Sequence, residues 1–138
     1  MVKQTLRVRH NIEVAHRLSL LPGKCEQIHG HSMWVVVELT GAVTPSGVVL
    51  GLEFGEVKKA FRDWLDTNFD HHLLLNVNDQ YAKLDLPGLR ACAGDPTTEN
   101  ISRWIGEWTA AQFPKGLEHV KCEVWETQVN SATWEADV

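Results

Sequence analysis

Residues 25–39, CEQIHGHSMWVVVEL, carry the clearest structural pattern in the chain. Apolar side chains recur at every second position, at Met33, Val35, Val37 and Leu39. Alternation of this kind is typical of a strand with one buried face. The same spacing puts His29 and His31 on one side of that strand, with Gly30 between them allowing close backbone approach. This segment therefore predicts a strand that begins with two neighbouring imidazoles.

Three further segments have the spacing of strands. Residues 6–16 alternate, with apolar side chains at Leu6, Val8, Ile12 and Val14. A second alternation covers 120–124, and a short strand is expected at 132–136. Thus, the chain is expected to begin and end with a pair of strands.

Two helices are expected between those pairs. In the first, apolar residues at Phe54, Val57, Phe61, Trp64 and Leu65 have helical spacing. The second follows Asp95 and Pro96, which suit a helix cap and a first helical position. Its apolar residues are Ile101, Trp104, Ile105 and Trp108. Residues 76–94 are predicted to form a long loop.

Composition narrows the class of protein. The 138 residues suit one domain, 1–138, with 43% hydrophobic and 22% charged residues. A net charge of −5 argues against a nucleic-acid partner, and no apolar run is long enough to cross a membrane. The sequence MVKQTLRVRH has no signal-peptide pattern. Three cysteines, an odd number, predict free thiols in a reducing cytoplasm.

The paired histidines suggest a metal site. Zn²⁺ at a catalytic centre typically has three protein ligands and one open position. His16 ends the first predicted strand and supplies a third imidazole if the two strands pair antiparallel. The alternative is that His29 and His31 are surface residues without a metal.

Two acidic positions also stand out. Glu126 continues the alternation of residues 120–124, in a slot where the pattern expects an apolar side chain. A buried carboxylate needs donors, which a ligand edge with two adjacent N–H groups would provide. The alternative is a bulge that turns Glu126 outward. Asp70 precedes His71 and His72, and it either orients an imidazole or simply decorates a helix end.

Taken together, these motifs resemble the 6-pyruvoyltetrahydropterin synthase/6-carboxytetrahydropterin synthase family. The matching stretches are 14–18 (VAHRL), 25–31 (CEQIHGH), 69–72 (FDHH), 96–100 (PTTEN) and 125–127 (WET). The resemblance implies an α+β tunnelling fold (ββααββ), a four-stranded antiparallel sheet with two helices on one face. It also implies a homo-oligomer, a trimer or homohexamer, whose sheets join into a β-barrel. Active sites then lie between subunits.

The same resemblance implies roles for individual residues. The zinc ligands would be His16, His29 and His31. Cys25 would be the catalytic thiol, with Asp70 and His71 as its proton-transfer partners in a site shared with another chain. The pterin would bind Glu126, supported by Thr97, Thr98 and Thr127. Zinc next to the substrate hydroxyls would ease proton removal and favour a Cys25 thiolate.

The spacing around Cys25 points to a subgroup. Three residues separate Cys25 from His29, which resembles the bacterial 6-carboxytetrahydropterin synthases of queuosine biosynthesis. Their substrate is 7,8-dihydroneopterin triphosphate, and a zinc-dependent lyase reaction is the expected activity. Glu26 also stands where another branch carries a catalytic Glu and forms 6-hydroxymethyl-7,8-dihydropterin for folate synthesis.

Other functions remain open at this point. One is the folate-branch cleavage, alone or together with the carboxy-forming reaction in one site. A second is 6-pyruvoyltetrahydropterin formation, which the short spacer after Cys25 disfavours. The last is a non-catalytic zinc- or pterin-binding module, for which a thiol beside an Asp–His pair would have no use.

Overall fold

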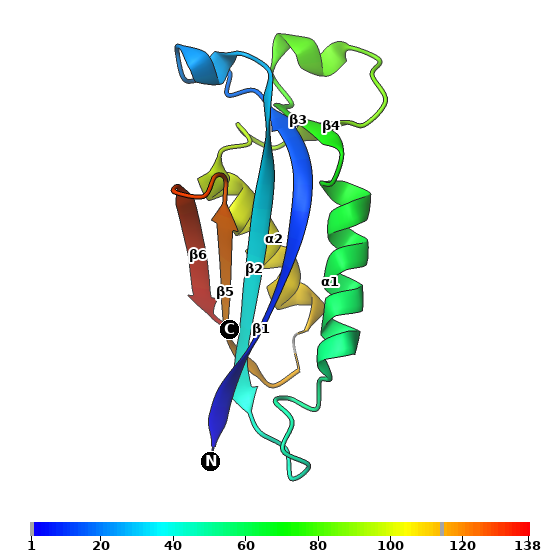
Figure 1. Ribbon diagram of the computed structural model, residues 1–138, viewed down its shortest axis with the longest axis vertical. Helices are drawn as coiled ribbons and strands as arrows, with labels where there is room; N and C mark the ends of the chain where they lie inside the picture. Colours follow the sequence, from blue (N-terminus) through cyan, green and yellow to red (C-terminus); the bar gives the residue numbers. More distant parts are fainter. Residues whose placement is uncertain (1, 114) are drawn as a thin grey trace.

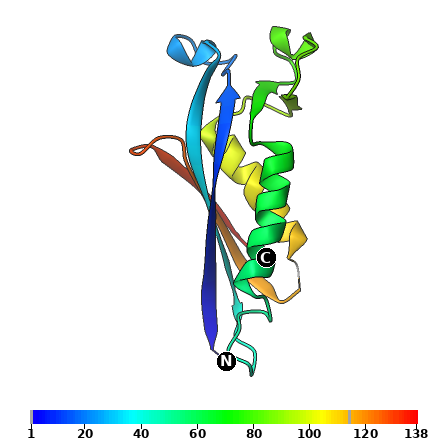
Figure 2. The ribbon, with the colours of Figure 1, turned by 45° about the vertical axis from the view of Figure 1, so that its right-hand side comes forward.

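The computed structural model describes residues 2–113 and 115–138. In these ranges one six-stranded sheet has the order β4-β3-β1-β2-β5-β6, with two helices on one face (Figure 1, Figure 2). The strands are β1 (Lys3–His16), β2 (His29–Ala42), β3 (His72–Asn76), β4 (Leu89–Cys92), β5 (Leu117–Trp125) and β6 (Ser131–Asp137). The helices are α1 (Phe54–Asn68) and α2 (Thr98–Gln112), with short 3₁₀ turns η1 (Lys24–Glu26) and η2 (Gln80–Lys83).

The β1–β2 ribbon is the longest element of the sheet. Its strands pair antiparallel along their whole length, from Lys3 opposite Ala42 to His16 opposite His29. One face of the ribbon is buried at alternate positions, as the sequence predicted, and Ile12 and Met33 are fully buried there. The antiparallel pairing that a third histidine ligand requires is thereby confirmed.

The two helices cover that buried face. In α1, Val57, Phe61 and Leu65 recur every fourth residue and are buried, as the helical spacing predicted. In α2, Ile101 and Ile105 are buried. The helices also touch each other through the stacked rings of Trp64 and Trp108, whose centroids are 4.3 Å apart. Neither helix of the described ranges has the length and apolar content needed to cross a bilayer.

The predicted start of α2 is wrong. Thr97, not Asp95, is the N-cap, and its side-chain oxygen accepts the Asn100 N–H at 3.0 Å. Both residue types are good caps, so Pro96 decided the prediction, but Pro96 lies before the cap in the structure. The Asp95 carboxylate is thus free to bind elsewhere.

The predicted four-stranded antiparallel sheet is incomplete. The strands β1, β2, β5 and β6 do pair antiparallel, but β3 adds to β1 in parallel and β4 adds to β3 in parallel. The expected loop 76–94 therefore contains η2 and β4. The strands β3 and β4 are only 5 and 4 residues long, and neither alternates in polarity. Strands this short and without alternation could not be predicted from the sequence.

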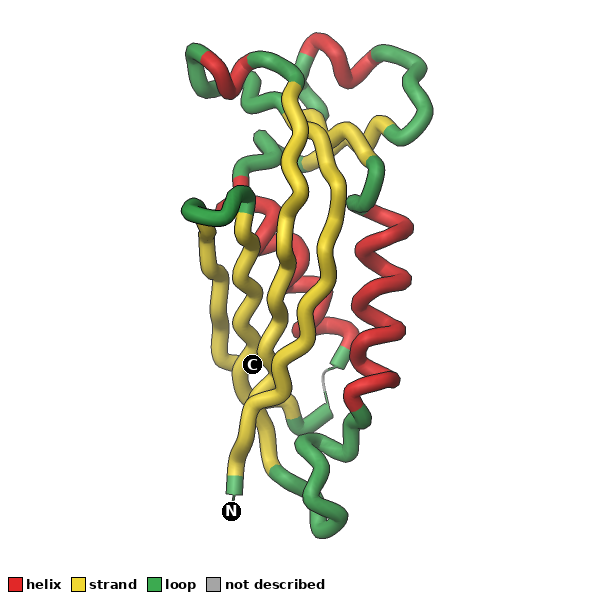
Figure 3. The backbone as a smooth tube through the Cα atoms, in the orientation of Figure 1, coloured by secondary structure: helices red, strands yellow, loops and turns green. Residues whose placement is uncertain are grey.

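The connections 17–28 and 77–88 lie together at the end of the sheet away from the N-terminus (Figure 3). The first joins β1 to β2 and carries η1, and the second joins β3 to β4 and carries η2. His16, His29 and His31 lie at this same end of the β1–β2 ribbon. Loops beside a rigid sheet end are a common setting for binding and catalysis.

Candidate active site

Three histidines meet at the loop end of the ribbon. The strand register puts His16 directly opposite His29, and His31 opposite Val14. All three side chains therefore continue the buried face of the ribbon beyond its apolar part. Their ring centroids are 4.5, 5.0 and 5.2 Å apart, and one nitrogen from each ring lies within 4.8 Å of the others.

Backbone carbonyls orient two of the rings. His16 Nδ1 is 2.7 Å from the Pro96 carbonyl oxygen, and His29 Nδ1 is 2.7 Å from that of Gln27. A carbonyl oxygen can only accept, so each Nδ1 carries the proton and each Nε2 carries a free lone pair. The Nε2 atoms of His16 and His31 are buried and have no hydrogen-bond partner. His16 has both features, a carbonyl behind its ring and an unpartnered Nε2, and this combination suits a metal ion.

Burial also favours the neutral form of His16. Desolvation lowers the pKa of His16, and the neighbouring imidazoles add to this effect, although the bond to Pro96 opposes it. A neutral His16 is the form that binds a metal. Three nitrogen donors leave room for a fourth ligand, which is the arrangement of catalytic zinc. The residues therefore fit the metal that the sequence predicted.

Glu126 lies beside this cluster. It follows the last residue of β5, and its Oε1 is 3.8 Å from His31 Nε2. The buried Thr98 hydroxyl donates a hydrogen bond of 2.5 Å to the other oxygen, Oε2. Glu126 is neither sealed in the core nor turned fully outward, since a quarter of its side chain is exposed. One carboxylate oxygen is thus held by α2, and the other lies near the histidines.

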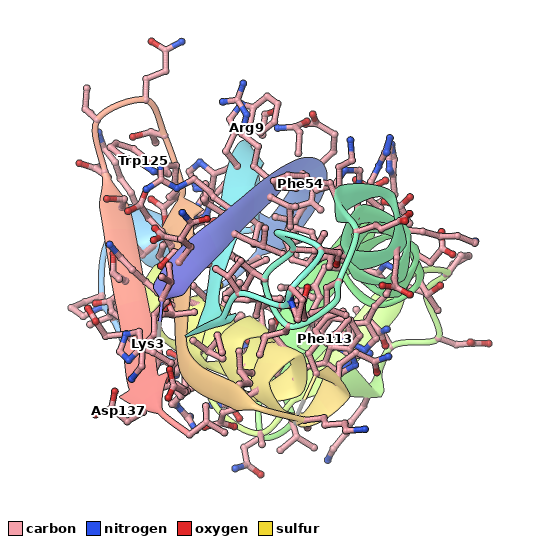
Figure 4. The ribbon with its side chains drawn as sticks, turned by 90° about the horizontal axis from the view of Figure 1, so that it is seen from below. Lys3, Arg9, Phe54, Phe113, Trp125 and Asp137 are labelled. Atoms are coloured by element: carbon pink, nitrogen blue, oxygen red, sulfur yellow. The ribbon has the colours of Figure 1, made fainter. Side chains whose placement is uncertain are left out.

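A cavity of about 660 Å³ opens next to Glu126. His31, Trp34, Trp125, Glu126 and Thr127 are among its lining residues. Arg9 also lines it, with its guanidinium 4.6 Å from the centre of the Trp34 ring. Figure 4 shows Arg9 and Trp125 on the side of the sheet away from α2. The cavity is large enough for a bicyclic heterocycle with a side chain.

The other predicted threonines have backbone partners. Thr97 caps α2 through its side-chain oxygen. Thr127 begins the turn after β5, and its oxygen accepts the N–H groups of Val129 and Asn130 at 3.2 and 3.1 Å. Only Thr98 reaches Glu126 directly.

Cys25 and Glu26 both lie on η1, and both are partly exposed. The Leu18 N–H donates to the Cys25 carbonyl at 2.8 Å and closes the loop behind the thiol. The backbone turns here, which is the condition for neighbouring side chains to serve one pocket. The three cysteines are free thiols, and burial raises the pKa of both Cys92 and Cys122. Cys92 ends β4, so its predicted place in a loop is wrong.

Asp70 and His71 form a second group after α1. His71 Nδ1 donates to Asp70 Oδ2 at 2.8 Å, and Asp70 Oδ1 accepts the Glu13 N–H at 2.7 Å. Burial opposes ionisation of Asp70, but these hydrogen bonds lower its pKa overall. His71 has φ of 61°, an uncommon conformation for a residue with a side chain. The expected Asp–His orientation is present.

The two groups share one cavity within the chain. His31 and His71 both line a second hollow of about 530 Å³, which also borders Gly30, Ser32 and Pro87. Cys25 lines neither this cavity nor the one beside Glu126. The structure therefore brings the histidines, Glu126 and Thr98 together at one point, with the thiol and the Asp–His pair around it.

Known proteins resemble this chain over most of its length. Residues 5–137 match the family model described as 6-pyruvoyl tetrahydropterin synthase. The chain belongs to this family. A Rickettsia typhi 6-carboxy-5,6,7,8-tetrahydropterin synthase is 30% identical over 108 residues, 74% of this chain and 75% of the relative.

Two further members differ in chemistry or in distance. A dihydroneopterin monophosphate aldolase of Pyrococcus furiosus is 25% identical over 125 residues, 91% of each chain. The crystal structure of a Plasmodium vivax 6-pyruvoyl tetrahydropterin synthase superposes with a TM-score of 0.79 at 16% identity, covering all of both chains. That structure shares the fold of this chain.

Sequence reasoning missed several residues of this pterin synthase family site. The carbonyls of Gln27 and Pro96 orient two histidines, but every residue has a carbonyl and no pattern marks these two. Arg9 and Trp34 fall within the predicted strands, and both line the cavity beside Glu126. Their outward parity on β1 and β2 was the available signal.

Proposed function

We propose that the protein is a 6-carboxy-5,6,7,8-tetrahydropterin synthase. It would convert 7,8-dihydroneopterin triphosphate and water to 6-carboxytetrahydropterin, acetaldehyde and triphosphate, for queuosine biosynthesis. The observation that carries the proposal is the 3.8 Å approach of Glu126 to the unpartnered His31 Nε2 at the edge of one cavity. It puts a heterocycle anchor next to a metal-binding group, and a relative with this activity supports it.

His16, His29 and His31 would hold a zinc ion through their Nε2 atoms. The fit rests on the two buried Nε2 atoms without partners and on the carbonyls behind His16 and His29. When bound, zinc supplies Lewis-acid chemistry to the hydroxyl groups of the substrate side chain.

Glu126 would bind the amino-pyrimidinone edge of the pterin. Its carboxylate can accept two adjacent N–H donors, and the Thr98 hydroxyl fixes one of its oxygens. Thr97 would support this contact by holding the first turn of α2, and Thr127 by shaping the turn that follows Glu126. Specificity for a pterin would follow, because a ring without those donors leaves the carboxylate unpaired.

Cys25 would take a proton from the substrate side chain as a thiolate. His71, oriented by Asp70, would carry protons to and from the same side chain. In a homo-oligomer, a trimer or hexamer, the Asp70–His71 pair of one chain would meet the Cys25 of its neighbour. A cytoplasmic location would keep this thiol reduced.

A second candidate is cleavage of the side chain to 6-hydroxymethyl-7,8-dihydropterin. Glu26 favours it, because this carboxylate shares the single turn of η1 with Cys25. The 25% identity to an archaeal dihydroneopterin monophosphate aldolase also favours it. Under this proposal Glu26→Ala would lower the hydroxymethyl product and leave the carboxy product unchanged.

The test is to incubate the zinc-loaded protein with 7,8-dihydroneopterin triphosphate and identify the product by mass. We expect 6-carboxytetrahydropterin and acetaldehyde. A 6-pyruvoyl or 6-hydroxymethyl pterin as the sole product would overturn the carboxy assignment. Tight pterin binding without turnover would instead indicate a binding module.

A further inference from the structure

The carboxylate of Asp95 is a buried charge that the proposed reaction does not use. It is 6% exposed and lies between β3, α2 and the β1–β2 connection. Its Oδ1 accepts hydrogen bonds from the Ser19 hydroxyl at 2.7 Å and from Asn76 Nδ2 at 3.0 Å. Its Oδ2 accepts the Leu20 N–H at 2.8 Å. Two of the three donors come from the β1–β2 connection.

The backbone of Asp95 belongs to the other half of the site. Its carbonyl accepts Asn100 Nδ2 and the Thr97 N–H, both at 2.8 Å, so it is tied to the first turn of α2. The next residue, Pro96, holds His16 by its carbonyl. Two residues further on, Thr98 holds Glu126. Asp95 is therefore fixed to the segment that orients both a metal ligand and the pterin anchor.

Ser19 and Leu20, which donate to the Asp95 carboxylate, belong to the β1–β2 connection, residues 17–28, which carries Cys25 and is named the Cys25 loop. Leu20 and Ser19 follow the buried Leu18, whose N–H donates to the Cys25 carbonyl at 2.8 Å. Arg17 is held separately by a buried ion pair with Asp79 at 2.5 Å. Asp95 thus connects Ser19 and Leu20, near the start of this loop, to the segment that begins α2.

These three donors also account for the charge of the group. Burial alone would raise the pKa of the Asp95 carboxyl, but the hydrogen bonds from Ser19, Leu20 and Asn76 lower it overall. Hydrogen bonds to an ionised acceptor are among the stronger ones in proteins. A loop that moved away would leave a buried charge with fewer donors, which is costly. The native loop position is the one that satisfies it.

We propose that Asp95 is a positioning residue that holds the Cys25 loop at a fixed place relative to His16 and Thr98. It acts through Leu20 and Ser19, and it touches neither the substrate nor the metal. This inference rests on the proposed function for the role of Cys25 in turnover, but the attachment of the loop to α2 is testable without any turnover.

The first experiment measures how fast iodoacetamide alkylates the protein at one fixed pH. Cys92 and Cys122 are buried, so alkylation of the folded protein reports on the partly exposed Cys25. In Asp95→Asn an amide donor faces one of the three donors, and loss of one charged hydrogen bond should speed alkylation of Cys25 about ten-fold. Asp63→Asn, the same change at an exposed ion pair on α1, is the matched control and should leave the rate unchanged.

The second experiment separates positioning from folding. In Asp95→Asn we expect kcat for 6-carboxytetrahydropterin formation to fall about ten-fold or more, as for other supporting residues of metal sites, with KM nearly unchanged. A merely structural residue would lower the melting temperature without this split. Ser19→Ala removes one donor to Asp95 and should also make alkylation of Cys25 faster. This variant keeps the test valid if Asp95→Asn does not fold.

Unchanged alkylation and unchanged kcat in a folded Asp95→Asn protein would overturn the proposal. So would unchanged alkylation in Ser19→Ala if Asp95→Asn fails to fold. If the wild-type protein makes no 6-carboxytetrahydropterin, the proposed function fails, while faster alkylation of the variants would still support the attachment of the loop by Asp95.

Discussion

The β1–β2 ribbon has an apolar middle part and a histidine end, which follow one alternating pattern but carry different side chains. In the middle of the ribbon, Ile12, Met33 and Val35 point to the helix layer and are fully buried. At the loop end, His16, His29 and His31 occupy the same face of the same strands. The alternation is continuous, and only the residue type changes.

The groups that cover each part of the ribbon account for the difference between them. The apolar part lies under α1 and α2, whose buried side chains complete a core. The histidine part meets backbone carbonyls and a carboxylate, from Gln27, Pro96 and Glu126. A rigid sheet thus sets the direction of the ligands, while its apolar half supplies the stability. The following substitutions test whether the apolar part can be changed without affecting the histidine end, and the reverse.

The largest effect is expected from removing a metal ligand. His29→Ala and His31→Ala should each lose the zinc that the wild-type protein binds at about one per chain. Added zinc should then raise the melting temperature of the wild-type protein but not that of the variants, because a ligand stabilises only what it binds. Metal analysis and thermal melting check this.

His119→Ala is the control, since His119 lies between Asp137 and Glu135 on the exposed face. If His29→Ala and His31→Ala both keep their full zinc content, the histidine end is not the metal site.

Removing the thiol should separate chemistry from binding. Cys25→Ala should lower the rate of 6-carboxytetrahydropterin formation by about 10²- to 10⁴-fold, the usual contribution of a general base. Zinc content and pterin affinity should persist, because Cys25 is not among the three ligands or the cavity residues. Cys122→Ala would be a poor control, since Cys122 is fully buried. A Cys25→Ala protein with wild-type turnover would rule out the thiol mechanism.

A change in the apolar part should affect stability alone. Ile12→Ala should cost about 2–5 kcal/mol of unfolding free energy, since Ile12 is fully buried. Its zinc content should remain that of the wild-type protein while it is folded. Ile28→Ala is the matched control, because Ile28 is 52% exposed beside the histidines, and it should cost less than about 0.5 kcal/mol. Denaturant unfolding measures the free energy of unfolding of both variants. Loss of zinc from folded Ile12→Ala would show that the apolar part and the histidine end are coupled.

The smallest effect is expected at Glu126, beside the histidine end. Glu126→Gln puts an amide donor where the pterin presents its own donors, and it should weaken pterin binding by about 2–4 kcal/mol. The melting temperature should change little, because the cost of burying the charge is relieved as well. Titration calorimetry with a pterin measures the affinity, and Glu107→Gln on the exposed face of α2 is the control. Unchanged affinity with a collapsed melting temperature would make Glu126 a structural residue.

Much of the fold could be predicted from the sequence where the pattern is long. The strand 6–16 and the strand starting at His29 have enough alternating positions to fix their faces, and antiparallel pairing then brings His16 to His29. In contrast, Leu73–Leu75 is a continuous apolar run and β4 has only 4 residues, so neither shows a period. Parallel additions of this kind depend on contacts far apart in the chain.

The site was predictable to a similar extent. The spacing of His29 and His31 on a strand fixes the direction of their side chains, so the convergence of the three histidines could be predicted from the sequence. The cap predicted at Asp95 lies two residues before the observed cap, Thr97, because both residue types suit that role. Two of the three donors to the Asp95 carboxylate, Ser19 and Leu20, lie 76 and 75 residues away in the sequence, and no local pattern predicts such pairing.

X-ray absorption at the zinc edge, on the zinc-loaded wild-type protein, tests the histidine end most directly. We predict three imidazole nitrogens at about 2.0–2.1 Å and no sulfur, because His16, His29 and His31 converge and Cys25 is kept for proton transfer. The spectrum of Cys25→Ala should then match that of the wild-type protein. A sulfur donor at about 2.3 Å that disappears in Cys25→Ala would make the thiol a ligand and contradict the account.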